Sequence, residues 1–134
     1  MGRHEQREQV FKLLFRVEFH ESEGMAEQAR LFFVDEENVG ISEKDREYIS
    51  EKYRMIQDKL PEIDKMIDEK AEGWITSRMG KVELTILRLA VYEILFDESV
   101  PGSVAINEAV EIAKKYGQET SGGFVNAILA KFVK

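Results

Sequence analysis

The sequence predicts an all-α fold, a compact bundle of about seven helices in two packed helical subdomains. Three observations predict it: apolar residues recur three and four positions apart along most of the chain, the alternating patterns typical of strands are rare, and only two prolines occur. A chain of 134 residues is long enough for one domain with a buried core. We expect a single domain over residues 1–134, with subdomains of about 1–72 and 73–134.

The first two helices are predicted from their apolar stripes. A helix over residues 3–21 carries Val10, Leu14 and Val17 at the i, i+4 and i+7 spacing that aligns side chains on one face. After a break in the pattern, a second helix is expected over residues 25–35.

The next two helices are predicted from their start signals. The run Ser42-Glu43-Lys44-Asp45 has the form of a capping box, in which the serine oxygen accepts a bond from the backbone N–H three residues later. It opens a helix that runs through Ile56. Pro61 suits the first turn of a fourth helix, because a proline lacks the N–H that would be unpaired there. That helix is expected to end near Gly73.

The second half of the chain is more apolar. After a short connection at Trp74, a helix over residues 79–96 is apolar nearly all the way round, which is typical of a central helix. A turn over 100–102 precedes a helix that Ser103 caps and Gly117 ends. A last helix, capped by Thr120 or Ser121, carries Phe124, Val125, Ile128, Leu129 and Phe132.

The charge balance limits which partners the chain can bind by itself. The formal net charge is −7, whereas proteins that hold nucleic acid through phosphate contacts alone usually present a basic surface. The first sixteen residues are locally basic, so a nucleic-acid site is expected to be local or completed by a partner. The sequence shows no cysteine, no apolar run of the roughly 20 residues that span a membrane, and no secretory signal. We therefore expect a cytoplasmic protein.

The sequence contains no motif of catalysis or metal binding. The two histidines, His4 and His20, are sixteen positions apart, and no zinc-binding HExxH pair occurs. Phosphate-binding glycine loops and the GxSxG nucleophile elbow are also absent from the sequence. We therefore predict a protein that is not an enzyme and needs no metal or cofactor. A small enzyme built on acidic residues stays open as an alternative, although the sequence supplies no carboxylate pair for it.

Two groups of residues are candidates for binding nucleic acid. Arg3 and Arg7 are i, i+4 neighbours with His4 beside them, and guanidinium groups offer planar donors that suit phosphates and base edges. Phe124 follows the expected start of the last helix, where free N–H groups attract phosphate and a ring can stack on a base. From spacing alone, a solvated helix start and ordinary capping with core packing explain the same residues.

Two charged residues, Arg88 and Glu93, fall inside the apolar helix over 79–96. A charge among apolar neighbours needs a partner, because an unpaired buried charge is costly. The two residues are five positions apart, so we expect each to pair with another helix or with backbone rather than with the other. Their predicted role is structural.

Three segments of the second half resemble the signatures of one family. They are Trp74-x3-Arg78-Met79-x2-Val82-Glu83-x2-Ile86-Leu87-Arg88-Leu89-Ala90-x-Tyr92-Glu93-Ile94, then Val100-Pro101-x2-Val104-Ala105-Ile106-Asn107-Glu108-Ala109-Val110-Glu111-Ile112-Ala113-Lys114-Lys115-Tyr116-Gly117, and Phe124-Val125-Asn126-Ala127-Ile128-Leu129. Their order and spacing are similar to those of the NusB family. The pairs Arg7-Glu8 and Leu14-Phe15 resemble the start of that family more weakly.

The resemblance implies an all-helical fold and a role in transcription antitermination. Members of this family bind boxA, a short single-stranded RNA element of ribosomal-RNA leaders, together with NusE, a small-subunit ribosomal protein. The complex joins RNA polymerase and lets it read through terminators. By position, the resemblance implies RNA contacts at Arg3, His4, Arg7 and Phe124, and makes Glu83 a candidate for the NusE-binding surface. An alternative is a helical protein–protein interaction module without direct RNA binding, for example a homodimer that covers its own basic end.

Overall fold

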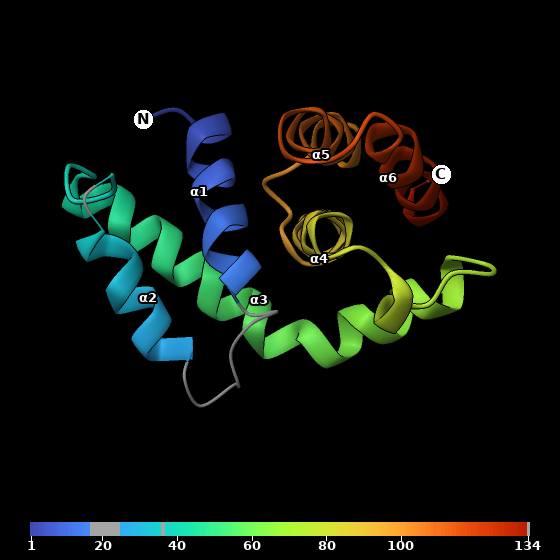
Figure 1. Cartoon of the computed structure of the whole chain (residues 1–134), viewed down its shortest axis with the longest axis horizontal. Coiled ribbons are helices and arrows are strands. Elements are labelled where there is room, and N and C mark those ends of the chain that lie inside the picture. The colour runs from blue at the N-terminus through green and yellow to red at the C-terminus, as the bar shows by residue number, and fades with distance from the viewer. Residues whose placement is uncertain (17–24, 36, 134) are drawn as a thin grey trace. The chain divides into compact units, whose positions relative to one another are not determined.

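The computed structural model describes residues 1–16, 25–35 and 37–133 (Figure 1). Within these ranges the chain forms α-helices and short 3₁₀ segments and no strand, which confirms the all-α prediction. None of the described helices is both long enough and apolar enough to cross a bilayer. The elements are α1 (Arg3–Phe15), α2 (Met25–Val34), α3 (Glu43–Lys70), η3 (Thr76–Arg78), α4 (Lys81–Phe96), α5 (Gly102–Tyr116), α6 (Ser121–Leu129) and η4 (Ala130–Phe132).

The described helices number six rather than about seven, because the predicted third and fourth helices form one long helix, α3. Pro61 therefore lies inside a helix and not in a first turn. The proline removes one backbone hydrogen bond, and its side chain is exposed. Ile56, Ile63 and Ile67 are fully buried on either side of it, so the apolar stripe continues in phase and outweighs the lost bond.

The start of α3 follows the predicted cap. The backbone N–H of Asp45 donates to Ser42 Oγ over 3.2 Å, which confirms Ser42 as the capping residue. The serine hydroxyl in turn donates to Asp45 Oδ2 over 2.9 Å. The helix α1 ends at Phe15 with Arg16 as its C-cap, and the rest of the predicted first helix, residues 17–21, lies outside the described residues.

The chain divides into an N-terminal unit, Met1–Gln57, and a C-terminal unit, Asp58–Lys134. The division falls within α3, one turn before Pro61, whereas the loop expected at 71–74 coincides with the end of that helix. In the N-terminal unit, α1 contacts α2. Its core is formed by the buried apolar residues Val10, Phe11, Leu13, Leu14, Phe32, Phe33, Ile49, Tyr53 and Ile56.

In the C-terminal unit, α4 contacts both α5 and α6 (Figure 1), and most of its residues are buried, as predicted for a central helix. Arg88 of α4 donates two hydrogen bonds to Asp64 of α3, from Nε to Oδ1 over 2.9 Å and from Nη2 to Oδ2 over 2.8 Å. Glu93 is fully buried and also has an interaction partner. Arg88 is therefore paired with another helix, as the sequence predicted.

Two loops fix the ends of the helices around α4. Gly73 has a φ of 86°, a backbone conformation that favours glycine, and it allows the chain to turn after α3. The backbone N–H of Thr76 then donates to Asp68 Oδ1 over 2.7 Å, which ties the connection back to α3. Farther along, α5 begins at Gly102 with Pro101 at its N-cap, so the predicted capping by Ser103 is wrong.

Candidate nucleic-acid interface

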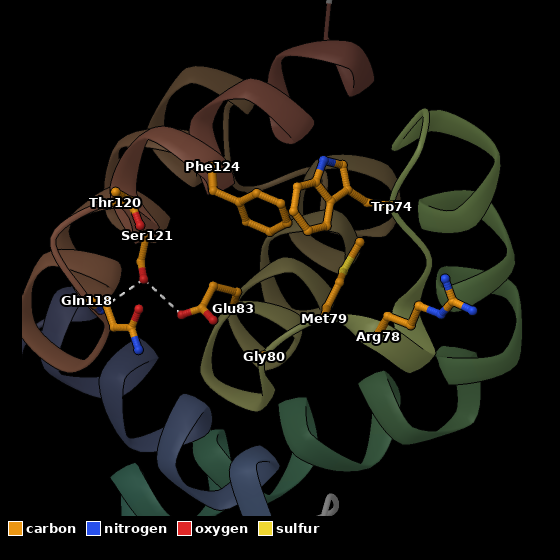
Figure 2. Close-up of a pocket in the computed structure, with 9 residues that line it drawn as sticks. All are labelled: Trp74, Arg78, Met79, Gly80, Glu83, Gln118, Thr120, Ser121 and Phe124. Carbon is orange, nitrogen blue, oxygen red and sulfur yellow. Dashed lines mark hydrogen bonds between the residues drawn. The ribbon is translucent and has the colours of Figure 1, made fainter.

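A pocket of about 330 Å³ opens in the C-terminal unit, where the connection after α3 meets the starts of α4 and α6 (Figure 2). Its lining combines aromatic, acidic, amide and hydroxyl side chains with one arginine. The residues that line it are Trp74, Arg78, Met79, Gly80, Glu83, Gln118, Thr120, Ser121 and Phe124.

One side of this pocket is an aromatic pair. The rings of Trp74 and Phe124 meet edge to face, with centroids 5.1 Å apart and an interplanar angle of 79°. Trp74 is 53% exposed, which is unusual for the only tryptophan of a chain this size. Met79 is buried and points toward the two rings (Figure 2). The pair therefore presents an apolar ring surface to solvent, suited to stacking on a planar group.

The opposite side of the pocket is a hydrogen-bonded acidic wall. Ser121 Oγ donates to Glu83 Oε2 over 2.9 Å and accepts from the backbone N–H of Gln118 over 2.9 Å (Figure 2). Ser121 is buried, so its hydroxyl fixes Glu83 relative to the start of α6. The predicted side-chain capping by Thr120 or Ser121 is therefore wrong. Thr120 is the N-cap of α6 but makes no side-chain cap hydrogen bond, and the Ser121 hydroxyl is bonded to Gln118 and Glu83 instead.

Two glycines leave the space that this wall needs. A Cβ added at Gly80 would lie 2.2 Å from Glu83 Oε1, and one added at Gly117 would lie 2.6 Å from Ser121 Oγ. Gly117 also ends α5 as predicted, donating its N–H to the carbonyl of Ala113. The wall thus depends on close backbone approach at both positions.

The arrangement offers the contacts that an unstacked nucleotide requires. An exposed ring pair can stack on a base, and a carboxylate and an amide at the edge can accept from or donate to its polar atoms. Arg78 is exposed and extends away from Phe124, at the pocket rim (Figure 2).

The described residues include no cluster of side chains that could hold a metal ion.

The structure brings two of the predicted site residues, Glu83 and Phe124, into this one pocket. Sequence reasoning had placed Glu83 on a partner-binding surface and Phe124 on an RNA-binding surface. It did not select Trp74, although an exposed tryptophan inside a family signature is the signal that could have found it.

The other three predicted residues lie at the start of α1, in the N-terminal unit. Arg3 is exposed, and its guanidinium carbon lies 4.7 Å from the centroid of the Tyr48 ring. His4 is also exposed, with Nε2 at 3.8 Å from Glu8 Oε2. Arg7 is only 6% exposed and has an interaction partner within the protein. The accessible basic groups of this turn are therefore Arg3 and His4.

Comparison with known proteins identifies the family. The model of the NusB family matches residues 4–134. The chain is 53% identical over 132 residues to the transcription antitermination protein NusB of Agathobacter rectalis, covering 98% of this chain and 99% of the relative.

Solved structures agree with this match. NusB of T. maritima superposes with a TM-score of 0.86 at 39% identity, covering 98% of this chain and 90% of that one. A structure of the antitermination factors NusB and NusE in complex with double-stranded RNA superposes with a TM-score of 0.83 at 28% identity, covering 98% and 97%.

The fold is thus that of a small all-helical factor rather than of a catalytic domain. The chain belongs to the NusB family. Since the relatives are named as transcription antitermination proteins, the prediction that the chain is not an enzyme is confirmed.

Proposed function

We propose that this protein is a transcription antitermination factor that binds boxA-type single-stranded RNA of ribosomal-RNA leaders together with NusE, and so promotes read-through by RNA polymerase in the cytoplasm. The observation that carries the proposal is the pocket in which the exposed Trp74–Phe124 pair faces the Glu83–Ser121 wall. The names of its relatives and the NusB–NusE–RNA structural neighbour support it.

The chemistry of the pocket favours one splayed nucleotide of a single strand. A base stacks on the ring of Phe124 or Trp74, which tolerates any base. Sequence preference then comes from its edge, where the Glu83 carboxylate accepts from an amino or imino N–H and rejects bases that present only acceptors. We assign Glu83 to RNA on this basis, because it lies beside the ring pair and is fixed by Ser121.

Further contacts to the RNA are assigned to the exposed cations. Arg78 lies at the rim of the pocket, and Arg3 and His4 lie at the start of α1. Arg7, which is buried, is assigned a supporting part beneath that turn. The family model spans nearly the whole chain, which supports a single RNA-binding domain over 1–134 that uses both units.

The net charge of −7 explains why a partner is needed. A few exposed cations neutralise few phosphates, so binding by the protein alone is weak and sensitive to salt. A basic ribosomal protein such as NusE both complements the acidic surface and adds phosphate contacts. We therefore expect NusE to tighten RNA binding strongly.

Fluorescence anisotropy of a labelled boxA-type RNA tests the proposal. The titration is run with and without NusE, at two salt concentrations, beside a scrambled single strand and a duplex of the same sequence. Tight binding that requires NusE, weakens with salt and prefers the boxA single strand is the expected result. The duplex is included because a structural neighbour contains double-stranded RNA.

Equal affinity with and without NusE would contradict the cooperative part of the proposal. Absence of binding in every condition would overturn it, and would favour a helical interaction module that acts through protein contacts alone. Size measurement by light scattering in the same buffers then shows whether the chain pairs with itself.

A further inference from the structure

A second hollow lies in the N-terminal unit, between the first turns of α1 and α3. Its volume is about 550 Å³, and its lining includes Arg3, Gln6, Lys44, Asp45 and Tyr48. None of these residues belongs to the pocket at Phe124. Of these residues only Arg3 is a predicted RNA contact, and the other lining side chains have no role assigned so far.

The aromatic ring of Tyr48 lines the hollow, and two cations lie close to it. The guanidinium carbon of Arg3 lies 4.7 Å from the centroid of the Tyr48 ring, and Lys52 Nζ lies 5.7 Å from the same centroid. Lys52 is buried and donates to Tyr48 Oη over 3.5 Å, which fixes the ring from within α3. A guanidinium stacked on a ring keeps its outer face open, and a nucleobase can stack on that face.

The charge of the hollow is set by Arg3, Lys44, the N-terminal ammonium of Met1 and one engaged carboxylate, Asp45, whose Oδ2 accepts from that ammonium over 3.3 Å. Asp45 accepts from Gln6 Nε2 over 2.8 Å and from Ser42 Oγ over 2.9 Å, and these bonds hold the pKa of Asp45 below its ordinary value. The carboxylate is thus committed to bonds within the unit. Neither Arg3 nor Lys44 forms an ion pair with another residue of the described ranges, so both charges are available to an anion.

We infer that this hollow is a second RNA subsite, which takes one nucleotide of a single strand, with its base stacked on the Arg3–Tyr48 pair and its phosphate against Lys44. The inference rests on the proposed RNA-binding function and extends it to α3. An anion alone would need only the cations, and an apolar ligand would need only the ring. A nucleotide uses both, because it joins a planar base to a phosphate.

Four variants test the subsite in the anisotropy titration with NusE and boxA-type RNA. Tyr48→Leu removes the ring that holds the Arg3 guanidinium in place as a stacking platform, and it is expected to weaken binding about tenfold, the effect of losing one stacked base. Tyr48→Phe keeps the ring and is expected to bind within about twofold of the wild type. Lys44→Gln removes one phosphate contact, so the slope of log K against log salt becomes shallower by about 0.7. Lys65→Gln, an exposed lysine on the same helix, is the matched control and leaves the slope unchanged.

A crosslink locates the contact independently of affinity. RNA that carries 4-thiouridine is irradiated in the complex, and the modified peptides are identified by mass spectrometry. An adduct on the segment around Tyr48 is expected. If adducts form only near Phe124, and Tyr48→Leu and Lys44→Gln both bind like the wild type, the subsite is refuted while the proposed function stands. If the wild type binds no RNA with or without NusE, both are refuted. Circular dichroism checks each fold, and Lys44→Gln remains decisive should Tyr48→Leu unfold.

Discussion

Ser121 Oγ donates a hydrogen bond to Glu83 Oε2 over 2.9 Å, and this bond joins the start of α6 to the first turn of α4. The same hydroxyl accepts from the backbone N–H of Gln118, so it cannot rotate away without leaving that N–H unpaired. The carboxylate of Glu83 is therefore held in one place beside the aromatic pair before any ligand arrives. A fixed acceptor discriminates between bases better than a mobile one, because its side chain loses no further conformational entropy when the base binds.

The first prediction separates the two roles considered for Glu83. Glu83→Gln keeps the size of the side chain and replaces a carboxylate oxygen with a hydrogen-bond donor. Base recognition therefore changes, while the shape of the protein surface is kept. We expect boxA affinity to fall about tenfold, the cost of one misplaced edge contact, and NusE affinity to stay constant. Anisotropy measures the first and calorimetry with NusE alone measures the second. Loss of NusE binding with retained RNA binding would return Glu83 to the partner surface.

A second prediction concerns two glycines of the same pocket region. A Cβ at Gly80 would lie 2.2 Å from Glu83 Oε1, whereas a Cβ at Gly123 meets nothing within 4 Å. Gly80→Ala displaces Glu83 from Ser121 and is expected to destabilise the fold by about 1 kcal/mol, the worth of one hydrogen bond. Gly123→Ala lies inside α6 and is expected to stabilise by about 0.5 kcal/mol, since alanine loses less backbone entropy. Thermal unfolding followed by circular dichroism distinguishes them. Equal gains in Tm for both variants would contradict this account.

Local signals predicted some ends of the helices correctly, whereas the side-chain caps expected at Ser103 and at Thr120 or Ser121 do not form. Ser42 caps the start of α3 and Gly117 caps the end of α5, because a cap and a C-terminal glycine act through their own neighbours. Pro61 was misread as a helix start, since the preference for a first turn is local and the buried stripe that overrides it is tertiary.

The site was predictable only in part. Phe124 was selected from its place at the start of the last helix, and Glu83 only from its position in a family signature. Ser121 and Glu83 are 38 positions apart, and only the packing of α6 against α4 unites them in one wall. Arg7 looked as accessible as Arg3, because charged residues are mostly exposed, yet its side chain is buried. Burial of this kind depends on the surrounding fold, which spacing does not reveal.

The third prediction tests the ion pair between Arg88 and Asp64. Their side chains are 13% and 28% exposed, and two of the guanidinium nitrogens, Nε and Nη2, donate to the carboxylate. Asp64→Asn leaves the partly buried guanidinium without its counter-charge, so we expect a loss of about 2 kcal/mol in the free energy of unfolding. Urea denaturation measures it. Glu51→Gln is the control, because the Arg54–Glu51 pair is exposed and such pairs contribute little. Comparable losses in the two variants would show that the Arg88–Asp64 pair stabilises the fold no more than an exposed ion pair does.

The fourth prediction is a pH dependence at Tyr53. Burial raises the pKa of this phenol to about 12 from the ordinary value of 10.0, while the charge of Arg16 acts in the opposite direction. Below pH 10.0 the phenol is protonated in both the folded and the unfolded chain, so the contribution of Tyr53 to the free energy of unfolding is fully present. Between these two pKa values the unfolded phenol ionises first, so stability falls as pH rises, by about 1.4 kcal/mol per pH unit.

Comparison of the wild type with Tyr53→Phe isolates that contribution from other groups that titrate in alkali. Urea denaturation of both proteins at several values of alkaline pH gives the difference in unfolding free energy. The wild type is expected to lose stability relative to the variant as pH rises through this range. A constant difference would mean that Tyr53 ionises equally easily in the folded and unfolded chains.

The last prediction concerns the aromatic pair of the pocket. Trp74 and Phe124 meet edge to face at 5.1 Å, but Trp74 is 53% exposed and so contributes less to the core than a buried ring. Trp74→Leu is therefore expected to weaken boxA binding about tenfold through lost stacking, with a change in unfolding free energy below about 1 kcal/mol. Phe124→Leu is expected to weaken RNA binding similarly. Quenching of the tryptophan emission by added RNA provides a direct signal of stacking, since the chain has only this one indole. Emission that RNA leaves unchanged, together with full affinity in Trp74→Leu, would place the base elsewhere in the pocket.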